Sequence, residues 1–171
     1  RTLANPGIDR INGQAKGWSN TNNISDIQTL INYIDGTIKP ATSWNPESYL
    51  NIWSIAMDNS GLLGYATFPQ LSTLPGLDAL ETNITAGVVV SWASVGSVSD
   101  PGADPDYGLG RTLTHELGHF FGLRHIWGDS NCGDDYCADT PPQDEDTGGC
   151  PIGPTANNCL PAGNKMFENY M

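Results

Sequence analysis

Basic side chains are scarce in this chain of 171 residues, with seven Lys and Arg against nineteen Asp and Glu and a formal net charge of −12. Seven scattered cations cannot form a phosphate-binding face, so the composition argues against a nucleic-acid partner. The sequence also lacks an apolar run long enough to span a membrane, and it lacks an apolar signal segment. We therefore expect a soluble acidic protein whose surface attracts basic segments of a partner.

Histidine is equally scarce, and its distribution is the most informative feature of the sequence. All three histidines fall within the eleven residues from His115 to His125. On an α-helix, His115 and His119 lie one turn apart on the same face, which suits one metal ion. His125 would leave that face on a continued helix, so it can join them only if the chain turns back. Gly122 allows the turn, because glycine adopts the left-handed conformation at a helix C′ position without a Cβ penalty.

Three imidazole ligands leave zinc one open position for water, which is typical of a catalytic site. Glu116 lies about 100° round the helix from the first ligand, so its carboxylate can reach that water without binding the metal. Zinc lowers the pKa of its water to about 7, and the glutamate can take the proton and pass it to a leaving amine. The pattern therefore predicts hydrolysis of an amide. A bare His-Glu-x-x-His pair arises by accident, but Gly122 and His125 at the required offsets make accident rare, on the order of one in 10⁴.

Other segments extend this pattern. The histidine motif followed by a methionine is the metzincin signature, and Asn169-Tyr-Met171 resembles its methionine turn. Five further segments are similar to the pappalysin family of metzincins: residues 49–53, 63–69, 126–129, 135–141 and 167–171. The resemblance extends from about Leu3 to Met171.

The resemblance implies an α/β metzincin catalytic domain, with a twisted mixed sheet, a backing helix and an active-site helix above a loop-rich, disulfide-containing lower part. It implies a secreted zinc endopeptidase that cleaves peptide or protein substrates, with a preference for bonds next to Arg or Lys. Met171 would form an apolar floor beneath the ligands; without the histidine motif it would be interpreted as an ordinary core residue. Family members continue past the methionine turn, and residues 1–7 look like the middle of a strand and its following loop. We therefore expect one catalytic domain over residues 1–171, truncated at both ends, and we predict no particular oligomeric state.

The acidic residues are concentrated where basic ones are missing. Between His125 and Asn164 there is no Lys or Arg, and seven carboxylates lie there: Asp129, Asp134, Asp135, Asp139, Asp144, Glu145 and Asp146. Calcium would relieve their repulsion, although the EF-hand spacing is absent. The resemblance implies structural calcium with Asp134, Asp139 and Thr140 as ligands. The alternative is a solvated acidic loop.

The four cysteines, Cys132, Cys137, Cys150 and Cys159, all lie in this same segment. An even number of cysteines in a Gly-, Pro- and Asn-rich loop indicates disulfides formed in an oxidising compartment, and four cysteines allow three connectivities. A four-thiolate zinc site is the competing interpretation, but the usual Cys-x-x-Cys pairs are absent. The resemblance favours Cys132 with Cys159 and Cys150 with a cysteine beyond the present end, which leaves Cys137 unassigned.

The remaining sequence predicts a scaffold. Residues 51–57 mix β-branched and aromatic residues over strand length, and the continuous apolar run 86–92 favours a buried strand. Residues 62–68 precede Pro69 and favour an edge strand, whose free backbone groups could pair with an extended peptide. The candidates for that contact are Gly64, Tyr65, Ala66 and Thr67, which the resemblance supports. An edge strand that merely closes the sheet is the alternative.

Three helices are expected. Residues 106–121 form the active-site helix, and residues 25–35 show helical apolar spacing after Ser25 as cap, although the family equivalent is largely extended. Asn45 and Pro46 form a typical helix start, with Asn as cap and Pro at the first helical position.

Two rival functions remain open at this stage. One is a non-catalytic domain, or a fragment too short to complete its substrate pocket, that keeps the metal for stability. The other is a zinc peptidase in which Glu145 or Glu168 replaces His125, which would leave the Gly122 turn without a purpose. Turnover of a peptide library separates the first rival from a protease, and removal of His125 tests the second.

Overall fold

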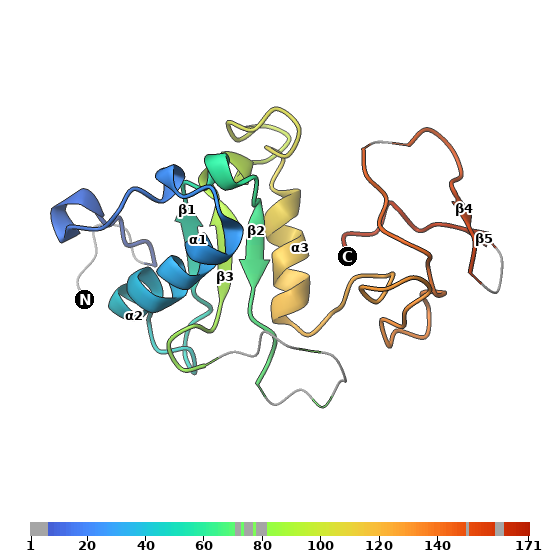
Figure 1. The fold of residues 1–171 in the computed structure, drawn as a ribbon, viewed down its shortest axis with the longest axis horizontal. Helices are drawn as coiled ribbons and strands as arrows, with labels where there is room; N and C mark the ends of the chain where they lie inside the picture. Colours follow the sequence, from blue (N-terminus) through green and yellow to red (C-terminus); the bar gives the residue numbers. More distant parts are fainter. Residues whose placement is uncertain (1–6, 71–72, 74–76, 78–81, 150, 160–162) are drawn as a thin grey trace.

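A three-stranded mixed sheet lies at the centre of the first part of the chain (Figure 1). The structure, a computed structural model, describes residues 7–70, 73, 77, 82–149, 151–159 and 163–171. The strands are β1 (Ile52–Ile55), β2 (Gly64–Ala66) and β3 (Val88–Ser91), in the order β1-β3-β2. β1 runs parallel to β3, and β2 runs antiparallel to it. All three strand predictions are confirmed, with shorter bounds than expected.

β3 and β2 have the exposure that their sequences predict. β3 is a Val-Val-Val-Ser run buried along its whole length, as expected of a central strand rich in β-branched residues. β2 is half-buried and lies at one end of the strand order within the described residues. The prediction of an edge strand here is therefore confirmed.

The backing helix is longer than predicted. It begins with α1 (Ile27–Tyr33), continues through a π-helical turn, η3 (Ile34–Ile38), and ends with α2 (Lys39–Thr42). The helix expected over 25–35 is confirmed, but its cap is Asp26, whose side chain accepts a hydrogen bond from the Thr29 N–H at 2.8 Å. The segment is helical, so the extended conformation that the resemblance implied for it is not found.

One apolar stripe of this helix covers one face of the sheet. Leu30, Ile34 and Ile38 recur every four residues, and they form a buried cluster with Trp53, Met57 and Val89. Each such side chain contributes roughly 1.5–3 kcal/mol when it leaves water. Because side chains alternate along β3, its neighbours Val88 and Val90 point to the opposite face.

An ion pair with a buried lysine ties the backing helix to the edge strand. Lys39 has no exposed surface, and its Nζ lies 2.8 Å from Asp35 Oδ1 and over the rings of Trp53 and Tyr65. The Tyr65 hydroxyl donates to the same Asp35 oxygen at 2.8 Å. Burial lowers the pKa of Lys39, and the neighbouring Asp35 carboxylate opposes that change.

The other face of the sheet carries α3 (Arg111–Phe120), as the sequence predicts for the active-site helix (Figure 1). Its start at residue 106 was predicted wrongly. Gly110 adopts a left-handed conformation with φ of 78° directly before the helix. The residues before it form turns, in which the Gly102 N–H donates to the Gly108 carbonyl and the Asp104 N–H donates to the Ala93 carbonyl.

The helix expected after Asn45 is also wrong, because only one turn forms. The Asn45 side chain accepts from the Glu47 N–H at 3.0 Å, which satisfies the capping tendency locally. The Asn51 amide then bonds both the N–H and the carbonyl of Trp44, and this closes the loop directly before β1. The chain has no length left for a helix.

The segment after α3 is rich in loops and contains one small antiparallel ladder, β4 (Ala156–Asn157) with β5 (Gly163–Asn164). A disulfide joins Cys132 to Cys159, the pair that the resemblance favours, and it excludes a four-thiolate zinc site. Cys137 is a free thiol, whereas Cys150 lies outside the described residues. Within the described part of the chain, no helix is long and apolar enough to cross a membrane.

Candidate metal centre

The end of α3 turns the chain back towards its own histidines. Gly122 has φ of 94°, its N–H donates to the His119 carbonyl at 2.8 Å, and the Leu123 N–H donates to the Gly118 carbonyl at 2.9 Å. These two bonds form a Schellman motif, in which a left-handed residue ends the helix. The glycine therefore has the conformation that the sequence predicts, and the next three residues return His125 to the helix.

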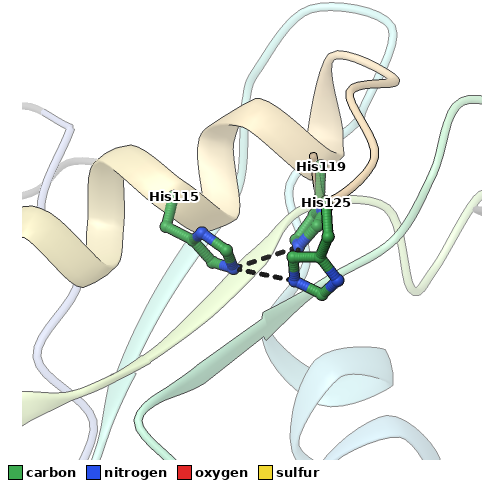
Figure 2. A group of neighbouring side chains, drawn as sticks. All are labelled: His115, His119 and His125. Carbon is green, nitrogen blue, oxygen red and sulfur yellow. Dashed lines mark hydrogen bonds between the residues drawn. The ribbon is translucent and has the colours of Figure 1, made fainter. Parts of the chain in front are cut away.

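The three histidines converge through their Nε2 atoms (Figure 2). The Nε2 of His119 lies 3.1 Å from those of His115 and His125, and the latter two are 3.3 Å apart. Tetrahedral zinc with Zn–N bonds of about 2.0–2.1 Å requires ligand nitrogens roughly 3.3 Å apart. The spacing of the three nitrogens therefore fits one zinc ion.

The other ring nitrogen of each histidine faces an oxygen atom. The Nδ1 atoms of His115, His119 and His125 face, in that order, the Tyr170 carbonyl, the Leu123 carbonyl at 2.9 Å and the Asp129 carboxylate at 2.5 Å. Carbonyl and carboxylate oxygens only accept, so each Nδ1 carries the proton and each Nε2 presents a lone pair. Three converging lone pairs repel one another unless a cation lies between them. The donor set itself therefore calls for a metal ion.

Burial keeps two of these imidazoles in the form that binds metals. It lowers the pKa of His119 to about 4 and lowers that of His115 as well, although the bond to the Tyr170 carbonyl opposes the change at His115. Both rings are thus neutral at pH 7 and do not need to lose a proton before they bind an ion.

Glu116 lies on α3 between the two helical histidines and is buried, with 6% of its surface exposed. Burial raises the pKa of its carboxyl group to about 8, and the positive charge of a bound ion would oppose this change. The side chain packs against Gly64 of β2, where a Cβ atom would come 2.8 Å from Glu116 Cγ and 2.9 Å from Oε1. A glycine at this position of the edge strand therefore leaves the space that the glutamate occupies.

Met171 lies against the same helix. A Cβ atom at Gly118 would come within 2.2 Å of Met171 Sδ, so the thioether packs directly on the α3 backbone beside the ligands. The preceding residue is also tied to α3, because Arg111 donates to the Tyr170 hydroxyl and lies over its ring. Met171 therefore packs on α3 next to a ligand, and its role as the apolar floor stays a prediction.

Sequence reasoning missed the residues that orient the ligands. Trp127 stacks on His125, with centroids 4.3 Å apart and planes 6° apart, and Phe68 meets the ring of His119 edge-on at 5.4 Å. The carbonyls of Leu123 and Tyr170 have no sequence signal, because every residue has a carbonyl. Asp129, by contrast, could have been found as an acidic residue four positions after a ligand.

The predicted calcium ligands and the rival zinc ligand Glu145 lie in the loop-rich segment after α3. The Thr140 hydroxyl lies 2.5 Å from Asp135 Oδ2, while an oxygen of Asp134 accepts from the Tyr136 N–H. Among the described residues, the three histidines are the one group of His, Cys, Asp or Glu side chains close enough to share a metal. Glu145 is instead within 3.3 Å of Lys165 Nζ, so it does not replace His125.

On the candidate peptide-binding strand, Gly64, Tyr65 and Ala66 pair with β3 on one side. The Tyr65 ring points towards the backing helix, where its hydroxyl reaches Asp35. Thr67 is buried, and both its N–H and its hydroxyl contact Gly87.

Comparison with known proteins assigns the class. Residues 32–171 match the peptidase family described as pregnancy-associated plasma protein-A. The chain therefore belongs to this pappalysin family of metallopeptidases, and its fold is that of a metzincin catalytic domain.

Individual relatives agree. An extracellular metalloprotease of Arthroderma otae is 37% identical over 137 residues, which are 78% of this chain and 46% of that protein. Extracellular metalloprotease 1 of Coccidioides posadasii is 38% identical over 71% of this chain and 41% of its own length. Among solved structures, Tannerella forsythia mature mirolysin in complex with a cleaved peptide is 42% identical, with a TM-score of 0.59 over 75% of this chain and 46% of that one. The chain thus spans less than half the length of these relatives.

Proposed function

We propose that this chain carries the catalytic centre of a secreted zinc endopeptidase. The observation that carries the proposal is the convergence of three Nε2 lone pairs beside a buried glutamate, in a chain that belongs to a metallopeptidase family. His115, His119 and His125 would hold the zinc, and Met171 would support the ligands from below. When bound, zinc supplies a Lewis acid that polarises a carbonyl oxygen and acidifies a water molecule.

Glu116 would act as the general base and then as the general acid. Its carboxylate would take a proton from the attacking water and give that proton to the leaving amine nitrogen. Two features support this role: the residue follows the first ligand directly on α3, and its side chain is buried, which shields the carboxylate from bulk water. The contact with Gly64 fixes the carboxylate in place.

The substrate would bind as an extended peptide along the free edge of β2. The proposed contacts are Gly64, Tyr65, Ala66 and Thr67. The first three form β2 and pair with β3 on one side, so the backbone groups on their other side would pair with the peptide. The excess of acidic residues supports a preference for Arg or Lys next to the cleaved bond, because a negative surface concentrates basic segments. If β2 only closes the sheet, peptides of different backbone length will bind equally well.

Structural calcium in the acidic loop is part of the proposal. Asp134, Asp139 and Thr140 remain the proposed ligands, supported by the absence of Lys and Arg between His125 and Asn164. Calcium added to zinc-loaded protein should raise its melting temperature, and Asp139→Asn should remove the effect. If the solvated-loop alternative holds, calcium will leave the melting temperature of both proteins unchanged.

Secretion is supported by two observations. The relatives are named extracellular metalloproteases, and the loop-rich segment contains a disulfide, which persists in oxidising compartments.

The decisive experiment pairs zinc content with turnover. We expect one zinc per chain by elemental analysis, cleavage of a peptide library, and loss of cleavage with a chelator. Glu116→Ala should lose cleavage while one zinc stays bound, since the glutamate is not a ligand. Retained cleavage in that variant would refute the role of Glu116. Zinc binding without cleavage by the unmodified chain would instead favour the rival function, a non-catalytic or incomplete domain.

A further inference from the structure

The loop that follows the third histidine is held by a side chain from the residue just before it. Arg124 is nearly buried, with 12% of its side chain exposed. Its Nη2 donates to the Gly128 carbonyl at 3.2 Å and its Nη1 donates to the Asp134 carbonyl at 3.3 Å. A planar guanidinium can bridge two acceptors in this way, which a single ammonium group cannot do. Arg124 therefore joins the two arms of the loop between residues 128 and 134.

The two arms of the loop lie so close together that the residue at position 128 must be glycine. A Cβ atom at Gly128 would lie 2.5 Å from the Asp134 nitrogen and 2.7 Å from the Gly133 carbonyl carbon. Gly128 also has φ of 58°, in the left-handed region that favours glycine. The ring of Tyr136, whose residue has φ of 63°, lies 5.6 Å from the Arg124 guanidinium. The loop is thus closed around the guanidinium group.

This closed loop aims Asp129 at the third ligand. Asp129 has φ of 57°, an uncommon conformation for a residue with a side chain, and its Oδ1 accepts from His125 Nδ1 at 2.5 Å. The Gly128 carbonyl that Arg124 binds belongs to the peptide group between Gly128 and Asp129. The guanidinium therefore fixes the orientation of the peptide plane directly before Asp129. A second contact, 3.8 Å from Arg124 Nη2 to Asp129 Oδ2, draws the carboxylate in the same direction.

We propose that Arg124 is a positioning residue for the zinc site, which it serves by holding Asp129 against His125. Arg124 is not one of the three ligands and would act on the metal through Asp129 and His125. It sets the orientation of the third imidazole and therefore the strength with which zinc is retained. This inference rests on the proposed zinc site, and its test reads zinc affinity, so it does not depend on whether the chain cleaves peptides.

The test is a double-mutant cycle on the zinc affinity of the full chain, measured by competition with a chelator. Arg124→Gln and Asp129→Ala should each weaken zinc binding by about 10- to 100-fold, the usual cost of losing a group that orients a ligand. If Arg124 acts through Asp129, the double variant should lose no more than the larger single loss. Asp129→Asn, which keeps an acceptor and tolerates the left-handed conformation, should lose less than Asp129→Ala.

Two controls separate this role from a general effect on folding. Arg124→Lys keeps the charge but can serve only one carbonyl at a time, so its zinc affinity should fall between those of the unmodified chain and Arg124→Gln. If Arg124→Gln does not fold, Arg124→Lys takes its place in the cycle. Arg10→Gln, a change at an exposed arginine, should bind zinc like the unmodified chain.

The outcomes are distinct. An unmodified chain that binds no zinc overturns the proposed function itself. If the unmodified chain binds zinc, unchanged affinity in the Arg124 variant overturns only the inference about Arg124. Additive losses in the double variant also overturn it, because they would show that Arg124 acts independently of Asp129.

Discussion

The contact between Gly64 and Glu116 makes the placement of the base open to a direct test by Gly64→Ala. The added methyl carbon would lie 2.8 Å from Glu116 Cγ, 2.9 Å from its Oε1 and 3.0 Å from the Val89 carbonyl oxygen. The carbonyl belongs to the central strand and cannot withdraw easily, whereas the glutamate side chain can rotate. The substitution therefore displaces the carboxylate and leaves the three histidines untouched.

The displacement can be estimated from atomic sizes. Carbon atoms pack best at about 3.5–4.0 Å, so Glu116 Cγ would need to move by roughly 0.7 Å or more. A misplacement of about 1 Å at a catalytic group costs on the order of 10²-fold in rate. We therefore expect kcat to fall by about 10²-fold while KM and zinc content change little. Overpacking of this kind also destabilises by about 1–3 kcal/mol, of which the stiffer unfolded chain offsets about 0.4–1 kcal/mol.

The assay is steady-state cleavage of one peptide taken from the library, with zinc measured in the same preparations. Gly36→Ala is the matched control, because a Cβ atom at Gly36 would meet nothing within 4 Å and its φ lies outside the left-handed region. That variant should keep the kcat of the unmodified chain. A normal kcat in Gly64→Ala, or an equal loss in Gly36→Ala, would show that the space beside the glutamate does not set its position.

Two further predictions concern stability. Replacing both Cys132 and Cys159 by serine should lower the free energy of unfolding by about 3.5 kcal/mol in urea titrations, because the disulfide closes a loop with a sequence separation of 27 residues; a loss below about 1 kcal/mol would contradict this. The hydrogen bond from Lys165, together with those from Asn158, holds the pKa of Asp144 at about 2, so its contribution is present above the unfolded value of about 3.9 and is lost as the pH falls through 2. Asp144→Asn should therefore show a flatter loss of stability than the unmodified chain between pH 4 and 2, and parallel curves would exclude this ion pair as the cause.

Patterns with a strict period were predicted well from the sequence. On a helix, the four-residue spacing of His115 and His119 places both side chains on the same face. The Val-rich run of β3 is typical of a buried strand. The Gly122 turn also followed, because few residues can end a helix in the left-handed conformation.

What the sequence did not predict depends on contacts between distant segments. Asn45 and Pro46 favour a helix locally, but the bonds from Asn51 to Trp44 close the chain into a loop first. Lys39 would be expected at the surface, yet an aspartate and two aromatic rings from separate elements enclose it. The oxygens that hold the histidines are mostly backbone carbonyls, so no residue type marks them.

The three ligand-orienting oxygens come from two parts of the chain: residues 123 and 129 lie in the loop directly after α3, and residue 170 lies beside Met171. A zinc ion seated among the imidazoles would therefore act as a thermodynamic cross-link, whose binding energy is added to the stability of both segments.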